Sequence, residues 1–138
     1  MKKIYLLTSI ILSCILFVGC AGDTTTEPKI TMSLEKSSPF GGTLLIEYQA
    51  GDEVADLSYG SEFMLEVQED DEWIKMVYVD EDVMFPLGLS FIQDGGKAEE
   101  KLNWGLLYGE LQPGHYRILK EFAIGDEVRT ETLEFDIE

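Results

Sequence analysis

Few residues of this 138-residue chain could do covalent chemistry. His115, between Gly114 and Tyr116, is the single histidine, so a Ser-His-Asp or Cys-His catalytic arrangement would have to use it. The sequence contains no Gly-x-Ser-x-Gly turn, which presents the nucleophilic serine of many hydrolases. If Tyr116 points into a core, the neighbouring His115 points to solvent. We therefore expect a surface histidine and no catalytic site.

The 27 acidic residues could serve as general acids or as Ca²⁺ ligands. A general acid needs an apolar pocket that raises its pKa, whereas most of these acids fall at turns or on the polar positions of alternating runs. Glu69–Glu72 and Asp80–Asp82 are the two candidate calcium runs. Calcium takes about six or more oxygens around one point, and neither run has the Asp-x-Asp-x-Asp-Gly spacing of a calcium loop. We predict solvated turns at both runs, with no metal and no cofactor.

The two cysteines lie near the N-terminus, and one of them follows an export signal. Lys2 and Lys3 precede the apolar run Ile4–Val18, which is too short to span a bilayer comfortably, and small Gly19 precedes Cys20. This arrangement resembles the lipobox of bacterial lipoproteins. The resemblance implies diacylglycerol on the Cys20 thiol, cleavage just before Cys20, and a membrane-anchored protein on the extracytoplasmic face. The alternative is an ordinary signal peptide that contains a cysteine.

The net charge of the chain limits the classes of partner that it can bind. Loss of residues 1–19 removes two of the 10 basic residues and none of the 27 acidic ones, which leaves a net charge of −19 on the mature chain. Such a surface repels phosphate backbones and anionic lipid headgroups, which argues against nucleic acid and favours cationic partners. It would also keep an exported protein soluble without forming any specific acidic site.

We predict a signal peptide over 1–19, a lipidated cysteine and flexible tether over 20–28, and one β-domain over 29–138. Ala21–Pro28 is small and polar and reaches at most ~27 Å when extended. Beyond it, apolar and polar residues alternate over 30–35, 44–49, 63–68 and 132–137, which is typical of half-buried strands. Glu69–Glu72 should form a hairpin tip, with Trp73 starting the return strand. About seven short strands and no convincing helix predict an all-β antiparallel sandwich.

A motif in the second half of the domain agrees with this fold. It comprises Asn103-Trp104, Tyr108-Gly109 and Leu111-x-x-Gly114-x-Tyr116-Arg117-Ile118. Together with Trp73 and a tyrosine–glycine pair at 59–60, this motif resembles a bacterial immunoglobulin-like domain family found on exported and membrane-attached proteins, mainly of Gram-positive bacteria. The match covers roughly Ile30–Ile137 and implies an immunoglobulin-like sandwich, but it implies little about activity, because the family is described by shape.

Part of this motif has a physical reason. In Ig-type sandwiches a tyrosine near the start of strand F folds back, so that its hydroxyl meets a backbone group a few residues upstream. Leu111 would then fill the core, Pro113 and the next glycine would make the turn, and the Tyr116 hydroxyl would bond near Leu111. Trp73 and Trp104 are interpreted as core or rim supports rather than as platforms for a ligand.

The stretch between Asp80 and Gln93 is the least regular, and its strands cannot be assigned from the pattern. Val83, Met84, Phe85 and Leu87 form an apolar run there, flanked by acids. If the run is exposed, it is a candidate docking patch, because an extended partner can add a strand to a sandwich edge. If it is buried, it is a core crossing between the sheets.

These observations predict a non-catalytic interaction domain, lipid-anchored on the outer face of the cell membrane, that binds an unidentified extracytoplasmic protein or peptide. Two alternatives remain from the sequence: an inhibitor of a cell-envelope enzyme, for which one rigid loop suffices, and a calcium-dependent adhesion module. An enzyme would need a concave site with convergent polar groups, which a sandwich of this size usually lacks.

Overall fold

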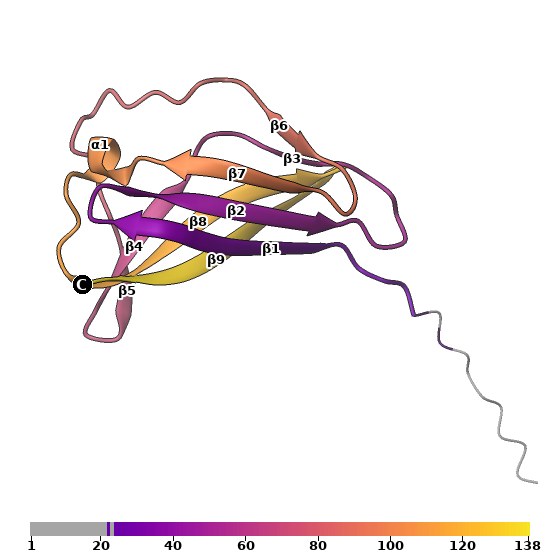
Figure 1. The fold of residues 1–138 in the computed structure, drawn as a ribbon, viewed down its shortest axis with the longest axis horizontal. Helices are drawn as coiled ribbons and strands as arrows, with labels where there is room; N and C mark the ends of the chain where they lie inside the picture. The colour runs from indigo at the N-terminus through magenta and orange to yellow at the C-terminus, as the bar shows by residue number, and fades with distance from the viewer. Residues whose placement is uncertain (1–21, 23) are drawn as a thin grey trace, which may run out of the picture.

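A computed structural model describes residue 22 and residues 24–138. The predicted signal peptide and Cys20 lie outside the described residues. Within them, nine strands and one short helix form two antiparallel sheets that pack face to face (Figure 1). The predicted β-sandwich is therefore confirmed, with nine strands in place of about seven. No helix in this part of the chain is long and apolar enough to cross a bilayer.

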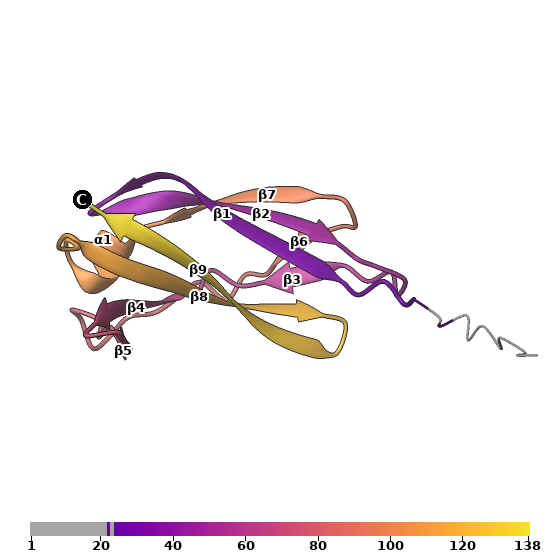
Figure 2. The same ribbon diagram turned by 90° about the horizontal axis from the view of Figure 1, so that it is seen from below.

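The two sheets differ in size. The elements are β1 (Lys29–Ser38), β2 (Gly41–Gln49), β3 (Leu57–Tyr59), β4 (Met64–Glu69), β5 (Glu72–Lys75), β6 (Ser90–Ile92), β7 (Lys97–Leu102), α1 (Trp104–Tyr108), β8 (Gly114–Ile124) and β9 (Glu127–Ile137). The smaller sheet has the order β1-β2-β7. The larger contains β5-β4-β8-β3-β6, in which β4 and β3 pair with successive parts of one edge of β8, and β9 pairs with the other edge of β8 along its whole length. Figure 2 shows the two layers from the side.

The core lies between the sheets and follows the two-residue period of the strands. Leu44, Ile46 and Tyr48 of β2 point inward and are at most 1% exposed, and so are Ile118 and Phe122 of β8. Intervening residues of both strands are partly or fully exposed. Because each sheet has one apolar face, closing the two faces on each other removes both from water.

The acidic run Glu69–Glu72 forms the tip of the β4–β5 hairpin, as predicted. Glu69 pairs with Glu72, and the two residues between them, Asp70 and Asp71, have φ angles of 50° and 62°. Two-residue hairpins of this kind need positive φ at both central positions, which aspartate adopts more readily than most residues. The backbone of the turn therefore explains why these aspartates are present.

The predicted all-β fold contains one helix that the sequence pattern did not reveal, the five-residue α1. Asn103 accepts the Leu106 N–H through its side-chain oxygen at 3.3 Å and so caps the start of α1. Gly109, at φ 79°, ends the helix, and its N–H donates to the carbonyl of Gly105 at 3.0 Å. Asparagine and glycine are favoured at these two positions. They are the signals in the sequence that could have predicted the helix.

Candidate functional site

The irregular connection between β5 and β6 carries a concentration of exposed apolar side chains. Eleven large apolar residues are exposed in the described part of the chain, and six of them lie between residues 77 and 91. Met84 is 90% exposed and Leu87 is fully exposed. We call these six side chains the apolar strip: Val77, Val79, Met84, Leu87, Leu89 and Phe91.

The candidate docking run lies within this connection, on the outside of the sandwich (Figure 1). Met84 and Leu87 face solvent, whereas Val83 and Phe85 are half-buried. The Phe85 ring packs edge-on against Tyr78, with ring centroids 6.3 Å apart. Of the two readings that the sequence left open, the observed exposure favours a surface patch over a core crossing.

A hydrogen bond and ring packing attach the start of the connection to the sandwich, whereas its later part lacks backbone hydrogen bonds. The N–H of Val79 donates to the carbonyl of Leu107 in α1 at 2.8 Å. The ring of Tyr78 packs on that of Tyr108, with centroids 5.1 Å apart. In contrast, residues 84–89 make no backbone–backbone hydrogen bond to any described residue. Apart from Pro86, which has no N–H and whose carbonyl accepts from Ser61 Oγ at 3.5 Å, their backbone groups are available to a partner.

A groove of about 360 Å³ lies beside the strip. One wall is the segment Phe85–Leu89 and the other is the turn Gly60–Glu62. The turn is fixed from the interior by Lys120, whose Nζ donates to the carbonyls of Gly60 at 2.8 Å and Glu62 at 3.2 Å. One wall of the groove is therefore held in place by a buried side chain.

Lys120 is the one charged residue that is buried in the described chain. Its Nζ lies 2.9 Å from Glu100 Oε2, a close charge contact rather than an aligned hydrogen bond, and 5.1 Å from the centre of the Tyr59 ring. Burial raises the pKa of the Glu100 carboxyl, and the Lys120 ammonium opposes that shift. The pair joins β8 of the larger sheet to β7 of the smaller one.

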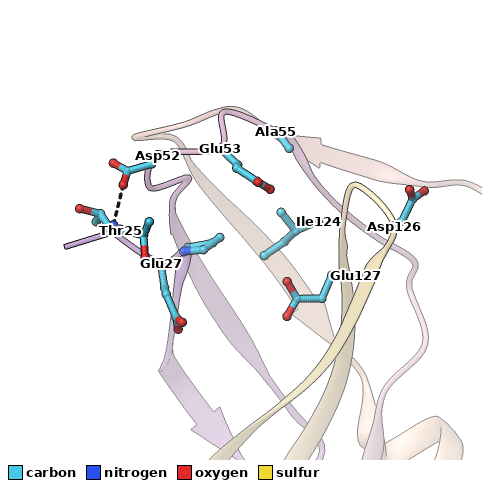
Figure 3. Close-up of a pocket in the computed structure, with 10 residues that line it drawn as sticks. Thr25, Glu27, Asp52, Glu53, Ala55, Ile124, Asp126 and Glu127 are labelled. Carbon is cyan, nitrogen blue, oxygen red and sulfur yellow. Dashed lines mark hydrogen bonds between the residues drawn. The ribbon is translucent and has the colours of Figure 1, made fainter. Parts of the chain in front are cut away.

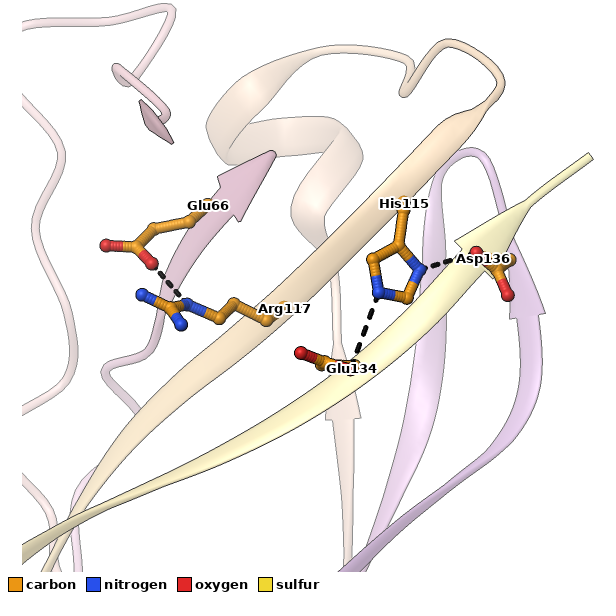
Figure 4. Close-up of polar contacts among 5 residues, drawn as sticks. All are labelled: Glu66, His115, Arg117, Glu134 and Asp136. Atoms are coloured by element: carbon orange, nitrogen blue, oxygen red, sulfur yellow. Dashed lines mark hydrogen bonds and ion pairs between the residues drawn. The ribbon is translucent and has the colours of Figure 1, made fainter. Parts of the chain in front are cut away.

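A second group of polar side chains lies on the outer face of the larger sheet (Figure 4). His115 Nδ1 lies 2.6 Å from Asp136 Oδ1, and His115 Nε2 lies 3.5 Å from Glu134 Oε2. The hydrogen bond to Asp136 raises the pKa of His115, and Glu134 adds to the shift. Arg117, two residues along β8, pairs with Glu66 of β4.

Trp73 covers part of this group. The guanidinium carbon of Arg117 lies 4.4 Å from the centre of the Trp73 ring, and the His115 ring lies 5.4 Å from it. Arg117 and His115 thus each have a carboxylate partner and a tryptophan neighbour. Such an arrangement stabilises cross-strand packing, and its groups are engaged with one another rather than aimed at a shared empty position.

A third feature is a hollow of about 510 Å³ where the chain enters the sandwich (Figure 3). The N–H of Thr26 donates to Asp52 Oδ2 at 2.7 Å, and the Asp52 N–H donates back to the Thr26 carbonyl at 3.0 Å. Arg129 Nη1 donates to the Pro28 carbonyl at 2.9 Å. The last residues of the predicted tether are thereby bound to the domain.

This hollow is acidic. In the described residues no three His, Cys, Asp or Glu side chains are arranged to hold a metal ion. The acidic groups that line the hollow make the electrostatic potential negative at this end of the domain. They are Glu27, Asp52, Glu53, Asp126 and Glu127.

Two aromatic residues of the predicted motif lie in the core. Trp104 is fully buried, donates from Nε1 to the Ser38 carbonyl at 3.1 Å, and stacks on Phe135 with ring centroids 5.1 Å apart. Tyr108 is buried, and its hydroxyl accepts the Leu65 N–H at 3.2 Å. Both rings fill space between the sheets, and their polar atoms are paired with backbone groups.

The rest of the motif shapes the turn into β8. The Tyr116 hydroxyl donates to the carbonyl of Gln112 at 2.6 Å, one residue beyond the position expected from the sequence. Leu111 is buried, Gly114 begins β8, and Trp73 is half-buried at the surface. These motif residues therefore support the fold, and only Gly60, of the tyrosine–glycine pair that accompanies them, lines the groove beside the apolar strip.

Sequence reasoning did not find the full extent of the apolar strip. It singled out residues 83–87 but not Val77, Val79, Leu89 or Phe91. Two signals were available: apolar residues alternate over 77–79 and over 87–91, and no lysine or arginine occurs between positions 75 and 97. The alternation predicts an extended segment. The absence of lysine and arginine means that no basic side chain interrupts this segment.

Two antiparallel sheets packed face to face, with a tyrosine corner before β8, define an immunoglobulin-like β-sandwich. A comparison with protein families matches residues 26–137 to the bacterial Ig-like domain. The chain belongs to this family, as the resemblance in its sequence predicted. No curated protein matches the chain.

Proposed function

We propose that this protein is a non-catalytic interaction module, held at the outer face of the membrane by a lipid on Cys20. The observation that carries the proposal is the apolar strip on the surface of a bacterial Ig-like domain. A concentration of exposed apolar side chains on a soluble domain often marks an interaction site. Six such side chains within 15 residues are therefore best explained as a contact surface.

The polar groups of the domain support a role without catalysis. His115 is held between Asp136 and Glu134 on the open face of the sheet, where water has access. A general base or nucleophile usually works in a concave site that excludes water and gathers several polar groups. Lys120, the buried cation, is engaged with Glu100 and two carbonyls. Each of these groups has a structural partner.

The anchor is supported by the order of residues before Cys20 and by the way the chain enters the domain. The tether joins the sandwich at its acidic end, beside Asp52, Glu53 and Asp126 (Figure 3). Anionic headgroups repel carboxylates. A lipid on Cys20 would hold this end near the bilayer, while its charge keeps the domain from lying flat on the surface.

The anchor is tested with the two cysteines of the chain, which form a matched pair. Cells expressing the wild type, Cys20→Ala or Cys14→Ala are labelled with an alkyne fatty acid and then fractionated. We expect label and membrane association for the wild type and for Cys14→Ala, and no label on Cys20→Ala. Equal labelling of Cys20→Ala, or an unlabelled wild type, would contradict the anchor.

The interaction is tested by photo-crosslinking in intact cells. A photoreactive amino acid replaces Leu87 of the strip or Val128 of β9, which is 60% exposed at the opposite edge of the larger sheet. We expect a discrete adduct from position 87 and only background from position 128. If no surface position forms a discrete adduct, the protein is not an interaction module.

A further inference from the structure

The edge of the larger sheet formed by β6 differs from the other edges in charge. Strands at the edge of a sheet usually carry charged side chains, which prevent other chains from pairing with them. Each of the other edge strands has at least two charged residues: β1, β5, β7 and β9. In contrast, residues 84–92, which include β6, carry none. This edge therefore lacks protection by charge, and its remaining protections are Pro86 and the short length of β6, three residues.

The backbone along this edge is also available. β6 pairs with β3 on one side only, through Ser90 and its neighbours. Residues 84–89, which lead into β6, have no backbone–backbone partner among the described residues. In Figure 1 this segment runs along the outside of the sandwich before it enters β6. Strand addition uses unpaired backbone groups beside apolar side chains, and residues 87–89 together with the outer side of β6 offer such groups beyond Pro86.

The charges around the strip specify the partner. No lysine or arginine lies between residues 75 and 97, whereas Asp80, Glu81 and Asp82 precede the run and Asp94 follows it. Glu62 lies in the opposite wall of the groove. Acidic residues thus flank both ends and one side of the uncharged segment 84–92. The complementary ligand has apolar side chains in its middle and cationic residues towards its ends.

The same charge argues against two other occupants. The chain carries a net charge of −17, so a second copy would bring its own acids against those that flank the uncharged segment. A bilayer rich in anionic lipid would be repelled for the same reason. An extended segment of a basic protein avoids both penalties.

We propose that the apolar strip and β6 bind an extended segment of a partner protein, apolar in its middle and flanked by lysine or arginine, which pairs with the backbone of residues 84–92. The inference rests on the proposed interaction function and adds the location of the site and the chemistry of the partner. Leu87 and Leu89 contact its apolar side chains, and the groove between Phe85–Leu89 and Gly60–Glu62 receives one of them. The buried Lys120 keeps the far wall of that groove in place.

The experiment uses a phage library of random dodecapeptides, selected on the purified full chain in detergent. We expect enrichment of peptides in which apolar residues alternate with other residues and lysine or arginine lies near the ends. Synthetic copies of these peptides should bind the wild type and lose about tenfold or more in affinity for Leu87→Asp. Methylation of alternate backbone nitrogens in the peptide should abolish binding, because it removes the strand-pairing donors.

Val128→Asp is the matched control, since it adds the same charge to an exposed position on the far edge. It should bind the selected peptides as the wild type does. Because Leu87 is fully exposed, Leu87→Asp should keep the circular dichroism spectrum and unfolding midpoint of the wild type. A loss of affinity can then be assigned to the surface rather than to unfolding.

Several results would overturn the inference. These are the absence of enriched peptides, enriched peptides without basic residues, and equal binding to Leu87→Asp. Self-association of the wild type that Leu87→Asp abolishes would identify a second copy as the occupant. Co-sedimentation with phosphatidylglycerol vesicles that Leu87→Asp abolishes would identify a bilayer. If in-cell adducts form only from other faces, the interaction function stands and this site is wrong.

Discussion

The ammonium of Lys120 lies 2.9 Å from the carboxylate of Glu100, inside the sandwich, and joins its two sheets. The Lys120 side chain is fully buried and that of Glu100 is 17% exposed. Removing such charges from water costs several kcal/mol per ion, which their attraction and the added hydrogen bonds offset only when both partners are present. The pair therefore makes the domain sensitive to the loss of either member.

Replacing Lys120 by methionine should strongly destabilise the domain. The change leaves the Glu100 carboxylate without its partner and the carbonyls of Gly60 and Glu62 without a donor. We expect a loss of about 3–5 kcal/mol in the free energy of unfolding, measured by urea denaturation.

The matched control is the double variant Lys120→Met/Glu100→Leu, which removes both charges. It should recover a large part of the lost stability, because no uncompensated charge remains in the interior. A double variant as unstable as the single one would show that the loss arises from packing or from the two carbonyls rather than from Glu100.

The stability of the domain should depend on the protonation of His115. Its pKa is raised above the usual 6.5, chiefly by the hydrogen bond to Asp136. A group whose pKa is higher in the folded state stabilises fully at pH values below 6.5, and this contribution is lost as the pH rises through the folded pKa. We therefore expect the free energy of unfolding to fall as the pH is raised through that window.

Asp136→Asn tests the cause of this shift. His115 is the single histidine, so its ring protons can be followed by NMR without assignment ambiguity. The amide cannot provide the carboxylate charge, so the titration midpoint should move down towards 6.5. An unchanged midpoint in the variant would mean that Glu134 or another group dominates.

Tyr116→Phe should cost about 1 kcal/mol of stability, since it removes the hydrogen bond from the hydroxyl to the Gln112 carbonyl and little else. The ring keeps its stacking on Phe135, 5.7 Å between centroids. Thermal and urea unfolding measure the change. The control is Tyr59→Phe, which removes a hydroxyl from another buried core ring. Equal losses of stability in the two variants would show that the Tyr116 hydroxyl contributes no more than that of another buried tyrosine.

Gly42→Ala should be destabilising by about 1–3 kcal/mol, because a Cβ at this position would lie 2.7 Å from Cη2 of the Trp104 ring. The indole is fully buried and stacked on Phe135, so it has little room to move. Gly60→Ala provides the control, since a Cβ there meets no atom within 4 Å. Equal unfolding midpoints for the two variants would contradict tight packing at Trp104.

The sandwich was predictable because its signals are local. Alternation along residues 44–48 and 133–137 fixes strands with one buried face, and the paired aspartates at 70–71 mark a two-residue turn. The turn before Tyr116 fixes the tyrosine corner over four residues. Each of these features depends on neighbours in the sequence, so the sequence alone is enough to predict them.

The candidate site was only partly predictable, because exposure is a tertiary property. Val83, Met84, Phe85 and Leu87 form one apolar run, yet Phe85 is covered by Tyr78 while Leu87 is fully exposed. No pattern within the run separates these two. The buried ion pair between Glu100 and Lys120 could not be predicted either, since each residue is placed by a different sheet.

The mutual hydrogen bonds between Thr26 and Asp52 limit how the domain can be presented. If Cys20 carries the lipid, as proposed, the segment 21–25 separates it from this contact, and five residues span at most ~17 Å. The C-terminus and the β4–β5 tip lie at the opposite end of the long axis (Figure 1). The anchored end of the domain would then stay within about that distance of the lipids, which favours contact with neighbouring proteins of the same cell over distant ones.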